Sequence, residues 1–193
     1  MSEDPRPKRD KGRTGLCARF LHNRRGSTAI EFAMLAFPFA LLVFAILESC
    51  ISFAGEEVMA NATDNVARQL RTGQVRAATV TDTSLKQMIC SQMQIIVAQN
   101  CPGLQVDLRQ YATFAAAAAA GFSIDKNGVI TLTGTSPTTF TAAPGPSESK
   151  NMLRVFYKWP VMTNFLAMAM SNMGTGYTLH FSSVTWQNEP FND

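Results

Sequence analysis

A continuous apolar segment constrains the fold of this chain more than any other feature. The sixteen residues from Phe32 to Leu47 carry no charge, and acids flank them at Glu31 and Glu48. Within residues 29–54, thirteen side chains are Leu, Ile, Phe or Val, and together they favour membrane insertion by roughly 4–8 kcal/mol. About 20 apolar residues suffice to cross a bilayer as a helix. The sequence therefore predicts a transmembrane helix over residues 27–54.

Positive charge lies on one side of this segment only. Residues 1–25 carry eight Lys or Arg against three acids, a net charge of +5, whereas residues 49–193 carry nine of each sign. The positive-inside rule places the basic end in the cytoplasm. Residues 1–26 are expected to form a flexible cytosolic arm, and no motif accompanies these charges that would favour nucleic-acid binding.

The two acids that flank the apolar segment differ from ordinary surface acids. Glu31 and Glu48 are seventeen residues apart, which is about 25 Å along a helix and less than the hydrocarbon thickness of ~30 Å. At least one of them must lie slightly inside the hydrocarbon core, where an acid is by default a functional candidate that needs a partner. Pro38, between them, is expected to kink the helix.

The helical pattern continues beyond the predicted membrane segment. Apolar residues recur there every four positions, at Val58, Ala62, Val66 and Leu70. Gly73 is a typical helix stop. We therefore expect residues 55–75 to extend the same helix outside the membrane, with two helices broken near Gly55 as the alternative.

Residues 76–193 are expected to form the exported domain. A second helix is predicted from about Asp82 to Ala98, capped by Thr81 or Asp82, with a buried face of Leu85, Met88, Ile89, Met93, Ile96 and Val97. Strand patterns follow at 104–108, 129–133, 152–159 and 177–187, with a short helix over 164–170, and the alanine run 115–120 is treated as low complexity. Helices first and strands afterwards predict an α+β fold with a small antiparallel sheet.

Four cysteines allow three pairings if all of them pair. Cys17 lies on the basic, reducing side, and Cys50 lies at the far end of the apolar segment. Cys90 and Cys101 are then the natural pair in an oxidising compartment, and the short loop that they would close is worth about 2–3 kcal/mol. The alternative is that both are reduced core residues.

The sequence contains no recognisable catalytic constellation. Its two histidines, His22 and His180, are expected on opposite sides of the membrane, and no Gly-rich phosphate loop or hydrolase motif is present. His180 is most simply a sheet residue facing polar surroundings. We expect no enzymatic activity, no cofactor, no metal site and no small-molecule substrate.

The bond between Gly26 and Ser27 carries the most specific chemical signal. A basic flank ends at Gly26, and Ser27-Thr28-Ala29-Ile30-Glu31-Phe32 leads into the apolar helix. This arrangement resembles the class III leader of type IV pilins and pseudopilins, which a membrane prepilin peptidase cuts after the glycine. The resemblance implies that Glu31 is the acid at position five of the mature chain. Cutting would create an ammonium at Ser27, ~6 Å along the helix from Glu31, and this amine or that of a neighbouring subunit would pair with the acid.

Further motifs narrow the resemblance to the TadE-like family of tight-adherence pilus assembly proteins. They are Phe37-Pro38, the segment 65–74 with Arg71, Thr72 and Gly73, the Cys90 and Cys101 pair, Tyr157-Lys-Trp-Pro160, and the ending Asn188, Glu189, Pro190 and Phe191. The family implies a minor pseudopilin needed to build adhesive Flp-type pili. It also implies a single-pass protein of the bacterial inner membrane, with its C-terminal domain in the periplasm. Its partners would be the prepilin peptidase, other pilin or pseudopilin subunits and the inner-membrane assembly platform.

Other interpretations stay open. Ser52-Phe-Ala54 before Gly55 satisfies the small-x-small rule of signal peptidase, so a secreted or membrane-anchored binding protein is the main alternative. The apolar segment, however, exceeds the usual signal core of about 7–15 residues. A lipoprotein cut before Cys50 is disfavoured by Glu48, and a single-span enzyme or sensor by the missing catalytic set.

Overall fold

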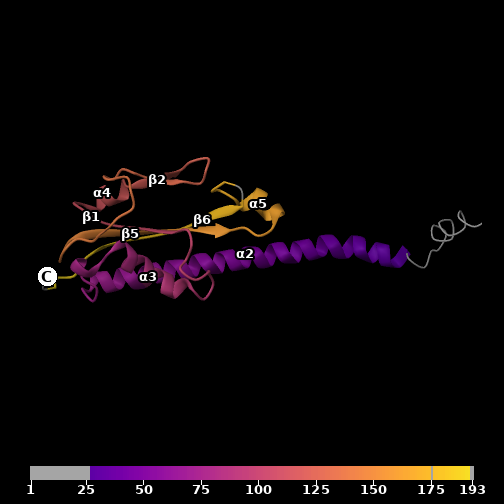
Figure 1. Ribbon diagram of the computed structural model, residues 1–193, viewed down its shortest axis with the longest axis horizontal. Coiled ribbons are helices and arrows are strands. Elements are labelled where there is room, and N and C mark those ends of the chain that lie inside the picture. Colours follow the sequence, from indigo (N-terminus) through magenta and orange to yellow (C-terminus); the bar gives the residue numbers. More distant parts are fainter. Residues whose placement is uncertain (1–26, 175, 192–193) are drawn as a thin grey trace, which may run out of the picture. The chain divides into compact units, whose positions relative to one another are not determined.

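The protein is described by a computed structural model that covers residues 27–174 and 176–191. The chain divides into two compact units, one up to Phe44 and one from Ala45 onward. The described residues of the first unit are entirely helical. The second unit holds the sheets, the remaining helices and the disulfide (Figure 1).

Helix α2 (Ser27–Arg71) runs without interruption through the boundary between the units, with Pro38 inside it. The prediction of one continuous helix is confirmed, and the alternative of a break near Gly55 is wrong. The helix ends because Gly73 adopts a positive φ of 71°, which glycine reaches without strain. The Gly73 amide donates to the carbonyl of Leu70 at 3.2 Å and so closes the last turn.

After the short turn η2 (Ala77–Thr79), helix α3 (Asp82–Met93) begins with a capping box. The Thr81 hydroxyl accepts from the Ser84 amide at 3.1 Å, and the Ser84 hydroxyl accepts from the Thr81 amide at 2.8 Å. The helix ends five residues before the predicted Ala98. In an unbroken helix Cys90 and Cys101 would lie about 16 Å apart, whereas the disulfide requires the observed Cα distance of 5.7 Å. The chain must therefore turn back between them.

The main sheet has the order β4-β1-β5-β6. Strands β1 (Leu104–Tyr111), β5 (Lys150–Pro160) and β6 (Tyr177–Gln187) pair antiparallel, and the two-residue β4 (Ala142–Ala143) pairs parallel with β1. Strands β2 (Gly121–Ile124) and β3 (Ile130–Thr133) form a separate hairpin. The α+β prediction is confirmed, with the sheet mixed through β4 rather than purely antiparallel.

Two short helices complete the second unit. Helix α4 (Phe114–Ala118) forms within the alanine run, capped by the Thr113 hydroxyl, which accepts from the Ala116 amide at 3.0 Å. Helix α5 (Asn164–Met170) lies between β5 and β6 and has the predicted bounds. The strong helix propensity of alanine explains α4, which the sequence analysis left without an element.

Other elements cover the sheet on both faces, helices α2 and α3 on one side and α4 and β2 on the other (Figure 1). Alternate residues of β5 supply both cores. Leu153, Val155, Tyr157 and Trp159 pack with α2 and α3, where Met59, Val66, Leu70, Leu85 and Ile89 are fully or almost fully buried. Phe156 faces the opposite way, against the β2–β3 hairpin and Phe181. The sheet therefore fixes the second half of α2 through its own hydrophobic core.

Candidate functional site

The first part of α2 presents a large apolar surface. Gly26 lies outside the described residues, and Ser27 lies within α2. From Ile30 to Phe39 the large apolar side chains are about two thirds to three quarters exposed, as for Phe32 at 72% and Met34 at 74%. Among the described residues, α2 is the one helix long and apolar enough to cross a membrane. A continuous apolar surface of this size requires lipid or a protein partner.

Glu48 receives its hydrogen bonds from the chain just before α5. Its carboxylate accepts from the Thr163 hydroxyl at 2.7 Å, from the Thr163 amide at 3.3 Å and from the Met162 amide. The hydroxyl of the next residue, Ser49, contacts the sulfur of Met170 at 3.8 Å. Glu48, one of the two acids that flank the apolar segment, thus joins α2 to the start of α5, more than a hundred residues further along the chain.

His180 of β6 is packed against α2 and not in the polar surroundings that the sequence analysis expected. Its Nε2 lies 3.0 Å from the Ser52 hydroxyl, and its ring stacks on Trp159 with centroids 4.9 Å apart. Burial lowers the pKa of His180 from 6.5 to about 4, and Nδ1 has no hydrogen-bond partner. The imidazole is therefore neutral near pH 7 and serves as a packing group that also binds Ser52.

The Trp159 ring lies over Gly55. A Cβ at that position would be 2.8 Å from Cη2 of Trp159 and closer still to Cζ3. Glycine is needed in the middle of this helix because an aromatic ring occupies the place of the side chain. Glu48, Ser52 and Gly55 form one row of contacts along α2 toward β5, β6 and α5.

The two motif segments carried by the family resemblance meet in space, although they are more than a hundred residues apart. Arg71 Nε lies 3.6 Å from a carboxylate oxygen of Glu189, and the Glu189 amide donates to the Arg71 carbonyl at 2.9 Å. A Cβ on Gly73 would be 2.8 Å from Cγ and Cδ1 of Phe191, so the ring lies directly on the glycine. We call Arg71, Gly73, Glu189 and Phe191 the C-terminal latch.

Asn188, next to the latch, uses both ends of its amide. Its side-chain oxygen accepts from Trp186 Nε1 at 2.8 Å, and its nitrogen donates to the carbonyls of Gly145 at 3.0 Å and Pro146 at 2.8 Å. The Thr72 hydroxyl donates to the Arg68 carbonyl at 3.0 Å, and Pro190 is exposed. These contacts hold the end of the described chain against the end of α2, and residues 188–191 therefore stabilise the fold at this point.

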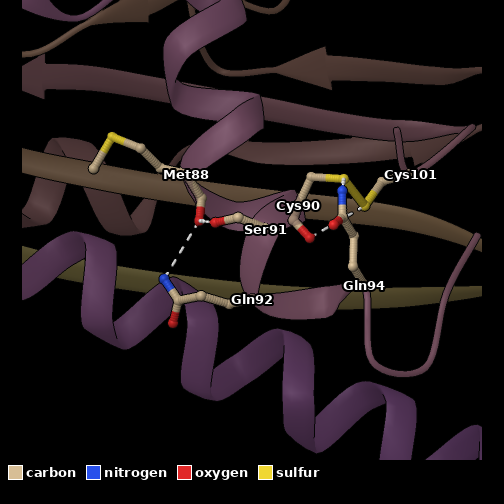
Figure 2. The surroundings of a disulfide bond; sticks show 6 residues. All are labelled: Met88, Cys90, Ser91, Gln92, Gln94 and Cys101. Atoms are coloured by element: carbon tan, nitrogen blue, oxygen red, sulfur yellow. Dashed lines mark hydrogen bonds between the residues drawn. A yellow bond between two sulfur atoms is a disulfide. The ribbon is translucent and has the colours of Figure 1, made fainter. Parts of the chain in front are cut away.

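Cys90 and Cys101 form the predicted disulfide (Figure 2). Both are buried, and Figure 2 shows the Gln94 side chain beside them, with its nitrogen 3.9 Å from the Cys90 sulfur. The bond joins α3 to the turn that precedes β1. Cys50 carries an exposed free thiol.

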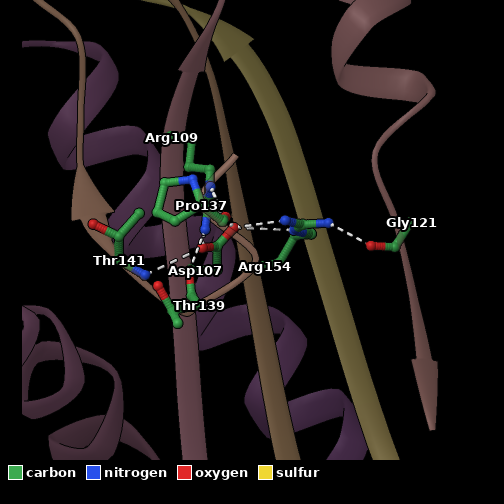
Figure 3. A network of polar contacts seen from close by, with 7 residues as sticks. All are labelled: Asp107, Arg109, Gly121, Pro137, Thr139, Thr141 and Arg154. Atoms are coloured by element: carbon green, nitrogen blue, oxygen red, sulfur yellow. Dashed lines mark hydrogen bonds and ion pairs between the residues drawn. The ribbon is translucent and has the colours of Figure 1, made fainter. Parts of the chain in front are cut away.

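A buried ionic cluster lies on the sheet face opposite α2 (Figure 3). Asp107 is completely buried and pairs with Arg109 at 2.8 Å and with Arg154 at 2.7 Å. Further guanidinium hydrogens go to backbone carbonyls, from Arg109 to Pro137 at 2.6 Å and to Thr139, and from Arg154 to Gly121 at 3.1 Å. Burial, as the largest cause, raises the pKa of nearby Tyr111.

The cluster is a structural tie, because both guanidinium groups bind the one carboxylate and backbone carbonyls. It fixes β2 and the loop before β4 to β1 and β5. The cluster was not predicted from the sequence. Asp107 and Arg109 two residues apart on one strand were the available signal, since residues i and i+2 face the same side.

The described residues contain no candidate metal site. Within residues 27–174 and 176–191, no group of three or more His, Cys, Asp or Glu side chains is arranged to hold a metal ion. His180 has only Ser52 and Trp159 as the partners described above.

These features define a class of protein in which one apolar helix continues as the core helix of an α+β domain that contains an internal disulfide. Residues 26–68 match the family model described as TadE-like protein. The resemblance inferred from the sequence is thereby confirmed over these residues, which comprise most of α2. No curated protein and no solved structure matches the chain.

Proposed function

We propose that this protein is a membrane-anchored, non-enzymatic subunit that takes part in assembly of adhesive Flp-type pili, as a minor pseudopilin. The match of residues 26–68 to the TadE-like family carries the proposal. The partners are other pilin or pseudopilin subunits and the assembly platform of the inner membrane.

In this proposal a prepilin peptidase cuts the chain after Gly26. The sequence around this bond supports it, because a basic flank ends at Gly26 and the apolar segment of α2 follows. The basic residues before Gly26 keep that end in the cytoplasm. The disulfide supports a periplasmic place for the second unit, since such bonds persist in oxidising compartments.

The exposed apolar side chains of α2 then have two successive environments. They contact lipid when the subunit waits in the membrane, and they pack against helices of other subunits during assembly. Glu31 pairs with the ammonium of Ser27 on the same or on a neighbouring helix, and this pairing sets the axial register of the helices.

Contacts within the second unit argue against the main alternative, a secreted domain released by signal peptidase before Gly55. That cut would remove Glu48 and Ser52, which bind Thr163 and His180. His180 would lose the hydrogen bond of a buried ring, at a cost of about 1–3 kcal/mol. The second unit is therefore better preserved by a cut at Gly26.

Processing is tested by expressing the full chain with a prepilin peptidase and sequencing the N-terminus of the mature protein. We expect Ser27 as the first residue, and the Gly26→Val variant should stay uncut. Gly15→Val, in the same basic arm, is the matched control and should be cut normally. Gly55 as the first residue, or unchanged processing of Gly26→Val, would refute the proposal.

The role of the acid is tested with Glu31→Gln, which removes the charge and keeps the shape. Membrane insertion, measured by carbonate extraction, should be unchanged, whereas surface pili should be strongly reduced. Glu57→Gln, at an exposed position further along α2, should leave both unchanged. Normal piliation with Glu31→Gln would exclude the proposed pairing.

A further inference from the structure

A long stretch of the second unit carries no formal charge. From Trp159 to Asn188 there is no Asp, Glu, Lys or Arg, in a chain of which 16% is charged. The stretch includes α5 and the chain on either side of it. It also contains four of the ten methionines, Met162, Met168, Met170 and Met173. An exposed protein surface in water usually mixes both signs of charge, so this composition calls for a different environment.

The segment around α5 has an inner and an outer apolar side. Leu166 and Met173 are 8% and 4% exposed and thus fill the interior. Met162 and Met168, in contrast, are 86% and 91% exposed, more than any other large apolar side chain described. Tyr177, at the start of β6, is also exposed. Met162 and Met168 therefore contribute nothing to the hydrophobic core and present their side chains to the surroundings.

The contacts of α2 place this surface at a defined level along the helix. The apolar run ends at Leu47, and the next two residues, Glu48 and Ser49, bind Thr163 and Met170. The uncharged residues 32–47 make a helical length of about 24 Å, and residues 28–47, which include Glu31, make about 30 Å, equal to the hydrocarbon thickness. The segment with the exposed methionines thus joins α2 at the first turn beyond the hydrocarbon.

We propose that residues 161–174 and Tyr177 form a second membrane contact, in which Met162 and Met168 enter the lipid surface beside the point where α2 leaves it. This inference rests on the membrane span of the proposed function. Absence of charge removes the desolvation cost that would oppose such a contact. Tyr177 suits the same boundary, because its ring is apolar and its hydroxyl is polar.

Glu48 has a particular role in this arrangement. An acid at the membrane boundary would be costly, but its carboxylate is satisfied by the amide and hydroxyl of Thr163 and by the amide of Met162. The same bonds hold the start of α5 at the boundary. With the helix and the α5 segment both in lipid, the protein is held at two places, and its rotation about the axis of α2 in the membrane is restricted.

The test is the depth of spin labels in the full chain, reconstituted in vesicles of phosphatidylethanolamine and phosphatidylglycerol. Cys17 and Cys50 are replaced by Ser, and the Cys90–Cys101 disulfide is kept. Labels are attached in turn to Met162→Cys, Met168→Cys, Leu42→Cys within the apolar segment, and Lys86→Cys on the exposed side of α3. Accessibility to oxygen and to a water-soluble nickel chelate is measured by power saturation. Both methionine positions are exposed, so these substitutions leave the core intact.

The labels at Met162 and Met168 should favour oxygen over the nickel chelate and lie at the headgroup boundary, roughly 5–10 Å deep. Lys86 should be aqueous and Leu42 deepest. Aqueous labels at both methionines with a buried Leu42 label would overturn the inference and leave the span standing. Labels shielded from both reagents only at high protein density would also overturn it, in favour of a neighbouring subunit. An aqueous Leu42 label would refute the span and the inference together.

Discussion

Substitution of Gly55 tests the packing of α2 on the sheet, because the contact with Trp159 determines whether an added methyl group stabilises or destabilises the protein. At an exposed position inside a helix, replacing glycine by alanine raises the free energy of unfolding by about 0.5–1 kcal/mol. At Gly55 the new Cβ would instead lie 2.8 Å or less from two carbons of Trp159. Overpacking of this kind costs about 1–3 kcal/mol. We expect the second effect to dominate, because stacking on His180 also holds the Trp159 ring in place.

Gly55→Ala should therefore lower the free energy of unfolding by about 1–2 kcal/mol, the difference between these two effects. The measurement is urea unfolding of the full chain in detergent micelles, followed by tryptophan fluorescence. Both tryptophans, Trp159 and Trp186, belong to the second unit and report on it. Asn61→Ala, at an exposed position of the same helix, is the control and should be slightly stabilising.

A second variant separates packing from backbone effects. When Trp159 is first replaced by Leu, the space above Gly55 opens, and Gly55→Ala should then be neutral or stabilising. This pair is followed by far-ultraviolet circular dichroism, because one fluorophore is lost. If Gly55→Ala in the unmodified chain stabilises as much as Asn61→Ala, the proposed contact between α2 and β5 is refuted.

Three further predictions concern the interior of the second unit. Asp107→Asn leaves two buried guanidinium groups without a counter-charge, and it should lower the free energy of unfolding in urea by about 3–5 kcal/mol. Asp125→Asn, in the exposed turn, is the control and should lower it much less. Equal losses for the two variants would contradict the stabilising role of the cluster. Because the pKa of His180 is lowered to about 4, the unfolded chain binds the proton first, so stability should be full above pH 6.5 and fall as the pH drops toward 4. After allowance for solvent screening we expect a loss of roughly 1–2 kcal/mol, visible as a difference between the pH profiles of the wild type and His180→Gln; identical profiles would exclude His180 as the cause. Replacing Cys90 and Cys101 by Ser should lower the free energy of unfolding by about 2–3 kcal/mol, and the exposed Cys50→Ser serves as control; a loss no greater than that of the control would contradict a stabilising disulfide.

The elements themselves were largely predictable from local pattern. Continuous apolar spacing indicated α2, alternation indicated β5 and β6, and the Thr81 cap marked the start of α3. These signals are local, because hydrophobic period and capping chemistry depend on residues within one or two turns. The disulfide followed from which cysteines share a compartment.

The polar contacts between distant segments were not predictable in this way. Glu48 and Thr163, Ser52 and His180, and Asp107 and Arg154 each meet only after the strands have paired in a particular register. A shift of one residue in that register would turn His180 and Arg154 to the opposite faces of the sheet. The helix α4 was missed for another reason, since an alanine run has high helix propensity but no amphipathic period to indicate burial.

The C-terminal latch has a consequence for the order of events during synthesis. Helix α2 is made first, yet its core residues Met59, Val66 and Leu70 are covered by strands that are made later, and Gly73 meets Phe191 only near the end. In the proposed topology, the apolar face of α2 beyond the membrane therefore stays uncovered while more than a hundred further residues are synthesised and exported. For that interval the nascent chain is exposed to association with other chains, and folding of the second unit can finish only after residue 191 has arrived.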